Sequence, residues 1–270
     1  MIRRNLFLLP LNNMEKKDRQ TGWGNVAPWY NTLLSSENTY QKEVILPKLL
    51  ALMQIKKGEV VLDLACGQGF FSRAFAEAGA TVTGADISPE LIKIAQENSP
   101  KNIHFIVASA DTLTGIVSGS FTKVSIVLAL QNITNLKGTI AECSRVLKPG
   151  GKLYVVLNHP TFRVPQKSDW GYDAKKQVQY RRIEKYLTET MLKIEMNPGE
   201  KNIKKKIYTT SYHRSLQDYF TTLHQSGFSV SRLEEWISHK KSQAGPKQKI
   251  EDVARKEIPL FMCIEAVKSI

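Results

Sequence analysis

The sequence predicts an α/β fold with a mostly parallel sheet and helices on both faces. Over residues 59–157, short apolar runs rich in β-branched residues alternate with helical patterns, the order that parallel βαβ units need. A turn of small residues directly after the first apolar run marks the sheet edge at which such folds bind ligands. We expect strands at about 60–64, 81–86, 103–107, 122–130 and 151–157, and helices at about 70–78, 89–98 and 138–147.

The central stretch is residues 60–69, which read VVLDLACGQG. Its first half has the pattern of a strand buried on both faces of a parallel sheet. Its second half is a turn of glycine and other small residues, which allows a ligand to approach the backbone closely. The helix that follows would point its N-terminus at that ligand. This arrangement is typical of a site for a nucleotide-like molecule.

The second predicted strand ends in a carboxylate, Asp86. It lies roughly 20 residues after the glycines, where an acidic residue that binds a ribose is expected. Ser88 and Pro89 already supply the N-cap and first position of the next helix. Asp86 is therefore not needed as a helix cap, and we interpret it as a ligand-binding residue.

These segments resemble the class I S-adenosylmethionine-dependent methyltransferases. The resemblance covers residues 55–160 well and the C-terminal part more loosely. Alanine stands at position 65, where the family most often has glycine. The matching motifs are Asp63-x-Ala65-Cys66-Gly67-x-Gly69, Asp86-Ile87-Ser88, Ser109-Ala110-Asp111 and Ser144-Arg145-Val146-Leu147-Lys148-Pro149-Gly150-Gly151.

The resemblance implies a Rossmann-like, seven-stranded, mostly parallel sheet with the order 3-2-1-4-5-7-6. It also implies S-adenosyl-L-methionine as the cofactor and S-adenosyl-L-homocysteine as the product. The ribose would lie on Asp86, the adenine amino group on Asp111, and the methionine end over residues 63–69 and the segment after strand four. The cofactor-binding candidates are Asp63, Ala65, Cys66, Gly67, Gly69, Asp86, Ile87, Ala110, Asp111, Leu128 and Ala129.

Four parts are expected along the 270 residues. Residues 1–54 would form a helical segment that closes over the cofactor, and residues 55–160 the Rossmann-like core. An insertion at 161–212, rich in aromatic and cationic residues, would form a lid after strand five. Alternating patterns at 192–196 and 206–212 predict a hairpin within it. Residues 213–270 would add a helix and the last two strands.

Composition constrains the partners. Three separated cysteines, Cys66, Cys143 and Cys263, have neither disulfide nor metal-ligand spacing. Together with the lack of a membrane-length apolar run, they favour a cytoplasmic protein with no metal and no membrane partner. The formal net charge is +13, with basic runs at 201–206 and 240–256. A solvated lysine-rich surface is the favoured interpretation, and nucleic acid is the alternative.

Methyl transfer needs alignment more than covalent help, so the acceptor site is harder to predict. His159 and His213 are the candidate general bases. His159 could equally anchor a turn, and the cationic and aromatic residues at 163 and 180–186 could equally be the solvated face of a lid helix. The substrate-binding candidates are Tyr30, Gln131, Asn132, His159, Phe162, Arg163, Tyr186 and Arg214.

The leading hypothesis is a methyltransferase for a small-molecule acceptor. The second is a methyltransferase for RNA, DNA or a protein side chain, which the charge favours. A dinucleotide-dependent oxidoreductase would need a third glycine at position 72, where the chain has serine. A non-catalytic protein of the same fold is the fourth reading, and the intact acidic and glycine positions argue against it.

Overall fold

The computed structural model describes residues 37–195 and 208–270. Its centre is a seven-stranded sheet with the order β10-β11-β5-β4-β1-β2-β3. Strands β1 to β5 pair in parallel, and β11 is antiparallel to both β5 and β10. This is the predicted order 3-2-1-4-5-7-6, so the fold prediction is confirmed. The strands are β1 (Val60–Leu64), β2 (Thr81–Asp86), β3 (His104–Val107), β4 (Phe121–Val127), β5 (Leu147–Asn158), β10 (Phe228–Trp236) and β11 (Phe261–Lys268).

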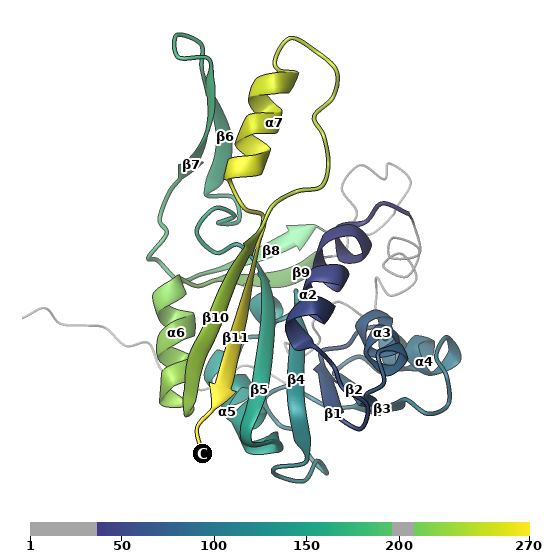
Figure 1. Cartoon of the computed structure of the whole chain (residues 1–270). Helices are drawn as coiled ribbons and strands as arrows, with labels where there is room; N and C mark the ends of the chain where they lie inside the picture. The colour runs from purple at the N-terminus through teal and green to yellow at the C-terminus, as the bar shows by residue number, and fades with distance from the viewer. Residues whose placement is uncertain (1–36, 196–207) are drawn as a thin grey trace, which may run out of the picture.

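Helices cover both faces of the sheet (Figure 1). Because side chains alternate along a strand, β5 contributes Leu153 and Val155 to one hydrophobic core and Tyr154 and Val156 to the other. The first core includes helices α5 (Leu136–Val146) and α6 (Leu216–Gln225). The second includes α2 (Leu46–Met53), α3 (Phe70–Glu77) and α4 (Pro89–Glu97).

Side chains cap the helices at Ser88, as predicted, and at Ser215. The hydroxyl of Ser88 accepts a hydrogen bond from the backbone N–H of Leu91 at 3.2 Å. Ser215 and Asp218 form a reciprocal capping box at the start of α6. A π-helical turn, η3 (Gln41–Ile45), precedes α2, so the helical prediction for the N-terminal segment holds from Gln41 on. The earlier part of that segment, through residue 36, lies outside the described residues.

The insertion after β5 contains two antiparallel pairs. Strands β8 (Thr190–Glu195) and β9 (Tyr208–His213) pair as the predicted hairpin requires, although the link at 196–207 lies outside the described residues. Strands β6 (Ser168–Asp173) and β7 (Val178–Ile183) form a second hairpin that the sequence did not predict. It packs against α7 (Gln248–Glu257). Figure 1 shows both beyond the carboxyl end of β5.

The interpretation of residues 180–182 as a helical face is wrong. Arg181 lies opposite Trp170 in the β6–β7 pair, and its guanidinium stacks over the Trp170 ring at 5.2 Å. Arg182 points outward and pairs with Glu184. Successive side chains of a strand point to opposite faces. Arg181 and Arg182 therefore point in opposite directions, whereas the helical interpretation placed them on one solvated face.

Candidate active site

A cavity lies at the carboxyl ends of β1, β2 and β4, and we call it the Asp86 cavity. It lies where an α/β sheet is expected to bind its ligand. Most of the predicted cofactor-binding residues line it, together with Asn132 from the predicted substrate-binding set. The predicted residues that it brings together are Asp63, Ala65, Cys66, Gly67, Asp86, Ile87, Leu128, Ala129 and Asn132.

The turn after β1 explains why small residues stand there. Ala65, Gly67 and Gly69 all have positive φ, at 58°, 56° and 79°, a conformation that costs little only for glycine. Ala65 adopts it in spite of its Cβ, at the position where the resembled family most often has glycine. Gly69 begins α3 with no side-chain cap on the helix. The first backbone N–H groups of α3 therefore face the ligand side of the turn.

Asp86 is fixed by backbone hydrogen bonds. Its Oδ2 accepts from the N–H of Gly67 and its Oδ1 from the N–H of Ser88, both at 2.9 Å. Burial raises the pKa of Asp86, and the backbone N–H groups of Ser88, Gly67 and Ile87 oppose that shift. Each carboxylate oxygen keeps a lone pair for a further donor. The side chain can therefore accept two hydroxyl groups without moving.

Asp63 is buried beside it. Its Oδ2 accepts a hydrogen bond of 2.5 Å from the hydroxyl of Ser72, which ties β1 to α3. Burial raises the pKa of Asp63 to about 7. Gln68 adds a polar atom to the same cavity, because its buried Oε1 has no hydrogen-bond partner among the described residues. Two carboxylates and an open acceptor suit a cationic ligand with hydroxyl groups, and S-adenosylmethionine fits that description.

Three predicted cofactor residues lie outside the lining of this cavity. Gly69 acts as the N-cap of α3, and Ala110 is buried in the core. Asp111 lines a separate surface hollow with Glu142 and Arg145. The Asp111 carboxylate accepts hydrogen bonds from Ser109 Oγ at 2.6 Å and Asn135 Nδ2 at 2.9 Å.

Two further cavities lie beyond the end of β4. The Tyr40 cavity, of about 300 Å³, is lined by Tyr40, Trp170 and Phe261, and it shares Leu128 with the Asp86 cavity. The His213 cavity, of about 310 Å³, is lined by residues of the insertion and by Gln131. Asn158 and Arg163 line both. The three cavities thus form a series that runs through Leu128 and then Arg163.

Arg163 extends between these two cavities. Its Nη1 donates to Asn158 Oδ1 at 2.6 Å, and its guanidinium lies 5.7 Å from the centre of the Phe261 ring. Burial lowers the pKa of Arg163, and the charge of Arg181 adds to that effect. Among the residues that the structure describes, no aspartate or glutamate lines either cavity.

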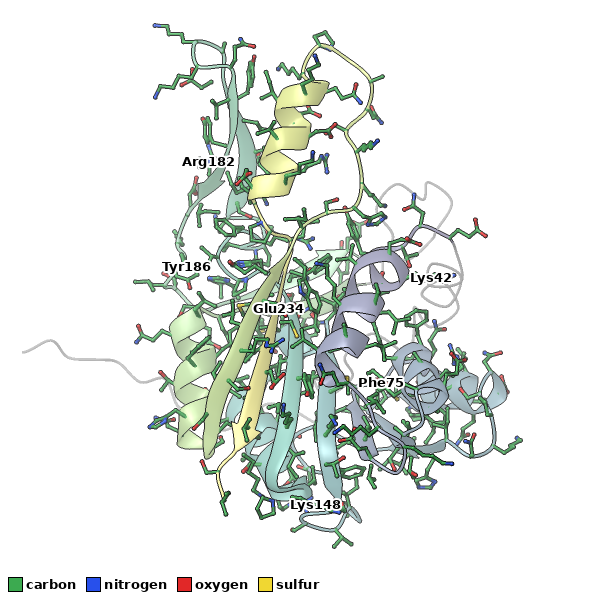
Figure 2. The ribbon with its side chains drawn as sticks, viewed as in Figure 1. Lys42, Phe75, Lys148, Arg182, Tyr186 and Glu234 are labelled. Atoms are coloured by element: carbon green, nitrogen blue, oxygen red, sulfur yellow. The ribbon has the colours of Figure 1, made fainter. Side chains whose placement is uncertain are left out.

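His213 lines its cavity with a defined proton position. Its Nε2 lies 2.7 Å from the carbonyl oxygen of Tyr186. Because a carbonyl can only accept, Nε2 carries a proton and Nδ1 of the neutral ring carries the lone pair. The Tyr186 hydroxyl accepts from the backbone N–H of Leu216 at 2.8 Å. Figure 2 shows Tyr186 beside the start of α6, so its role is to hold the segment that carries His213.

His159 is engaged at both ring nitrogens. Its Nδ1 accepts from the N–H of Thr161 at 3.2 Å and of Phe162 at 3.4 Å, and its Nε2 donates to Glu235 at 2.8 Å. Burial lowers the pKa of His159, and Glu235 opposes this. The ring is 2% exposed and lines none of the three cavities. These contacts favour the alternative in which His159 anchors a turn. Phe162 packs against it with the two rings tilted at 42° and their centres 4.8 Å apart.

Arg214 and Gln131 organise the segment after β4. Arg214 Nη2 donates to the carbonyls of Ile133 and Thr134 at 3.0 and 2.8 Å, and its Nε to Glu189 at 3.0 Å. Gln131 Nε2 donates to the carbonyl of Leu128 at 2.8 Å. These bonds hold η4 (Leu130–Asn132) against the end of β9.

Tyr30 lies outside the described residues. Sequence reasoning missed Trp170 and Phe261 as cavity residues, because one is on the unpredicted hairpin and the other on the last strand. Asn158 had a usable signal, as a polar residue at the carboxyl end of a central strand. Within 37–195 and 208–270, no group of His, Cys, Asp or Glu is placed to hold a metal ion. The helices of that part include none long and apolar enough to cross a membrane.

The sheet order, the turn after β1 and the carboxylate at the end of β2 are features of the class I S-adenosylmethionine-dependent methyltransferase fold. Residues 62–155 match the family model of the methyltransferase domain. The chain therefore carries this domain at its centre.

Individual proteins with known names are similar to the same region. A demethylmenaquinone methyltransferase of Tropheryma whipplei is 37% identical over 112 residues, which is 40% of this chain and 46% of that protein. A ubiquinone biosynthesis O-methyltransferase of Xanthomonas oryzae is 38% identical over 101 residues, 36% of this chain and 42% of that protein. The chain thus spans less than half the length of these relatives.

The fold extends further than the sequence similarity. The crystal structure of an S-adenosylmethionine-dependent methyltransferase from Mesorhizobium loti superposes with a TM-score of 0.66 at 24% identity. The superposition covers 82% of this chain and 96% of that one. It relates the two proteins by their fold.

Proposed function

We propose that this protein transfers a methyl group from S-adenosylmethionine to a small-molecule acceptor. The observation that carries the proposal is the position of Leu128, which lines both the Asp86 cavity and the Tyr40 cavity. A cofactor in the first and an acceptor in the second would meet there. When bound, S-adenosylmethionine supplies a methyl group whose bond to the sulfonium breaks with the electron pair left on sulfur. The protein has to align the acceptor and exclude water.

On the cofactor side, Asp86 would accept the ribose hydroxyls, and Asp63 with the turn at 65–69 would hold the methionine end. The backbone at Leu128 and Ala129 would pass under that end. Ile87 follows Asp86 in the lining and would pack on the adenosine. Ala110 and Asp111 stay predictions for the adenine end, since they lie outside the described lining of the cavity.

On the acceptor side, His213 is the better general base. Its Nε2 is committed to the carbonyl of Tyr186, so it can take the proton of an acceptor hydroxyl or amine at Nδ1. Phe162 and His159 would act by holding the turn after β5. The insertion at 161–212 would serve as the lid, because β9 packs on η4 at the end of β4. The segment at 1–54 would complete it.

The names of the similar proteins agree with a small acceptor, because each contains the name of a quinone. The second candidate is a methyltransferase for RNA or a protein side chain. The net charge of +13 favours it.

Calorimetric titration with S-adenosylmethionine and S-adenosylhomocysteine tests the cofactor half. We expect both to bind, and Asp86→Asn to weaken binding about 10- to 150-fold, since hydrogen bonds to a charged group contribute about 1.5–3 kcal/mol. Glu97→Gln removes the same charge from an exposed side chain on α4 and should leave binding unchanged. Equal affinity in Asp86→Asn would refute the ribose assignment, and binding of NAD in place of both ligands would refute the function.

A further inference from the structure

Arginines line the acceptor cavities, and no aspartate or glutamate is among the described residues of either lining. Arg163 and Arg255 line the Tyr40 cavity, and Arg163, Arg181 and Arg214 line the His213 cavity. Buried charges in proteins are normally paired or satisfied by hydrogen bonds. A cavity with several guanidinium groups and no carboxylate therefore favours an anionic ligand.

A guanidinium binds a carboxylate through its Nε–Nη2 edge. Three of these arginines already use Nε of that edge in hydrogen bonds within the protein. Arg181 donates from Nε to the carbonyl of Phe162 and from Nη2 to Ser168. Arg214 donates from Nε to Glu189 and from Nη2 to two carbonyls. Arg255 donates from Nε to Ser242 Oγ at 2.8 Å. Each has its Nε committed within the protein.

Arg163 differs from them. Its side chain makes one hydrogen bond to the described residues, from Nη1 to Asn158. Its Nε–Nη2 edge has no partner in that part of the chain, and no described carboxylate forms an ion pair with it. This edge presents two parallel N–H groups, the geometry that matches a carboxylate. Asn158 and the Phe261 ring hold the guanidinium in place, so the edge is preorganised.

In the His213 cavity a second polar group lacks a hydrogen-bond partner among the described residues. Gln131 is 8% exposed, and its Nε2 must face the carbonyl of Leu128, which fixes the orientation of the amide. Its Oε1 is therefore the atom left over, and it is buried with no partner among the described residues. The residue Gln131 lines the His213 cavity beside Arg163, and its leftover acceptor suits a ligand that donates a hydrogen bond.

Taking the proposed function as its basis, we infer that the methyl acceptor is a small carboxylic acid that Arg163 binds through its Nε–Nη2 edge. A hydroxyl or amine of the acceptor donates to Oε1 of Gln131. The rings of Tyr40, Trp170 and Phe261 make the Tyr40 cavity suitable for an aromatic or otherwise apolar body. Arg163 is thus the residue that selects an acid over its neutral analogue.

The test uses the full chain saturated with S-adenosylhomocysteine and two probes of almost the same shape, 2-naphthoate and 2-naphthamide. Titration calorimetry at pH 7.5 should show at least roughly tenfold tighter binding of the acid, because only the acid forms the charged bidentate pair. Arg163→Met should abolish this preference. Arg163→Lys keeps the charge without the planar edge, so this variant should retain part of the preference for the acid. Arg232→Met, which removes an exposed arginine on β10, should retain all of it.

Equal binding of acid and amide to the unmodified protein would overturn the inference, as would a preference that persists in Arg163→Met. The affinity for S-adenosylhomocysteine and the melting temperature are measured for every variant, so misfolding is detected separately. If Arg163→Met is misfolded, Arg163→Lys is compared with the unmodified protein in its place. If S-adenosylhomocysteine binds and the preference is absent, the carboxylate inference fails alone. If S-adenosylhomocysteine does not bind, the proposed function fails, and the two probes are still compared on the free protein.

Discussion

At the residue scale, Asp63 couples proton binding to the proposed cofactor site. The side chain is buried, and burial raises its pKa to about 7, although the Ser72 hydroxyl stabilises the ionised form. Below pH 7 the free protein therefore keeps a proton on Asp63 in most molecules. A cationic ligand end beside this carboxyl favours the ionised form, so binding has to release that proton.

We expect the affinity for S-adenosylmethionine to rise about tenfold from about pH 5.5 to pH 7 and then level off, as free Asp63 becomes ionised. The sign follows from the raised pKa, because protonation of the free protein competes with binding only below it. Titrations in buffers of different ionisation enthalpy should show nearly one proton released at pH 6. Asp63→Asn should bind more weakly and lose both the pH dependence and the proton release. Asp86, whose pKa burial also raises, is still present in this variant, so the loss would assign both effects to Asp63.

Ser72→Ala provides a variant with a predicted direction. Without the hydroxyl that donates to Asp63 Oδ2, the ionised form is less favoured, so the rise in affinity should shift to higher pH. A pH profile that is unchanged in both variants would place the titrating group elsewhere.

At the element scale, Arg214 joins the end of β9 to the segment after β4. Its side chain is buried, and it donates to the backbone carbonyls of residues 130, 133 and 134. Arg214→Met would leave these carbonyls without that donor and Glu189 without its partner. We expect a loss of about 3 kcal/mol in the free energy of unfolding, measured by urea denaturation.

Arg182→Met is the matched control. Arg182 is also in the insertion and pairs with Glu184, but both side chains are largely exposed (Figure 2). Exposed pairs contribute little, so the change should stay within about 0.5 kcal/mol. Similar losses in the two variants would show that Arg214 does not connect these elements as its contacts indicate.

The same elements show what the sequence could predict. β1, β2 and the cap at Ser88 follow from local patterns, and the structure has them as expected. The β6–β7 hairpin was missed because its alternation is weak and its turn has no glycine, proline or asparagine. The pairing of His159 with Glu235 joins residues 76 positions apart. No local pattern encodes such a contact, so the choice between base and turn anchor needed the structure.

At the scale of the whole molecule, the net charge of +13 has to be reconciled with a small acceptor. Cationic side chains occur at both ends of the described structure, since Figure 2 shows Lys148 at one end and Arg182 at the other. A spread charge attracts polyanions weakly and without selection, while the arginines of the acceptor cavities attract small anions to one place. The basic run at 201–206 lies outside the described residues.

We therefore predict weak RNA binding that is separate from catalysis. In filter-binding assays the dissociation constant should lie at or above about 1 µM at physiological salt and rise steeply as salt is added, as for contacts to phosphates alone. With methyl-labelled S-adenosylmethionine, label should appear in a small-molecule extract and not in total RNA. Transfer should also tolerate salt better than RNA binding does, because the cavity arginines are shielded from bulk ions and surface lysines are not. Label in RNA, joined to tight binding at low salt, would favour the nucleic-acid methyltransferase and require an acceptor face open enough for a polymer.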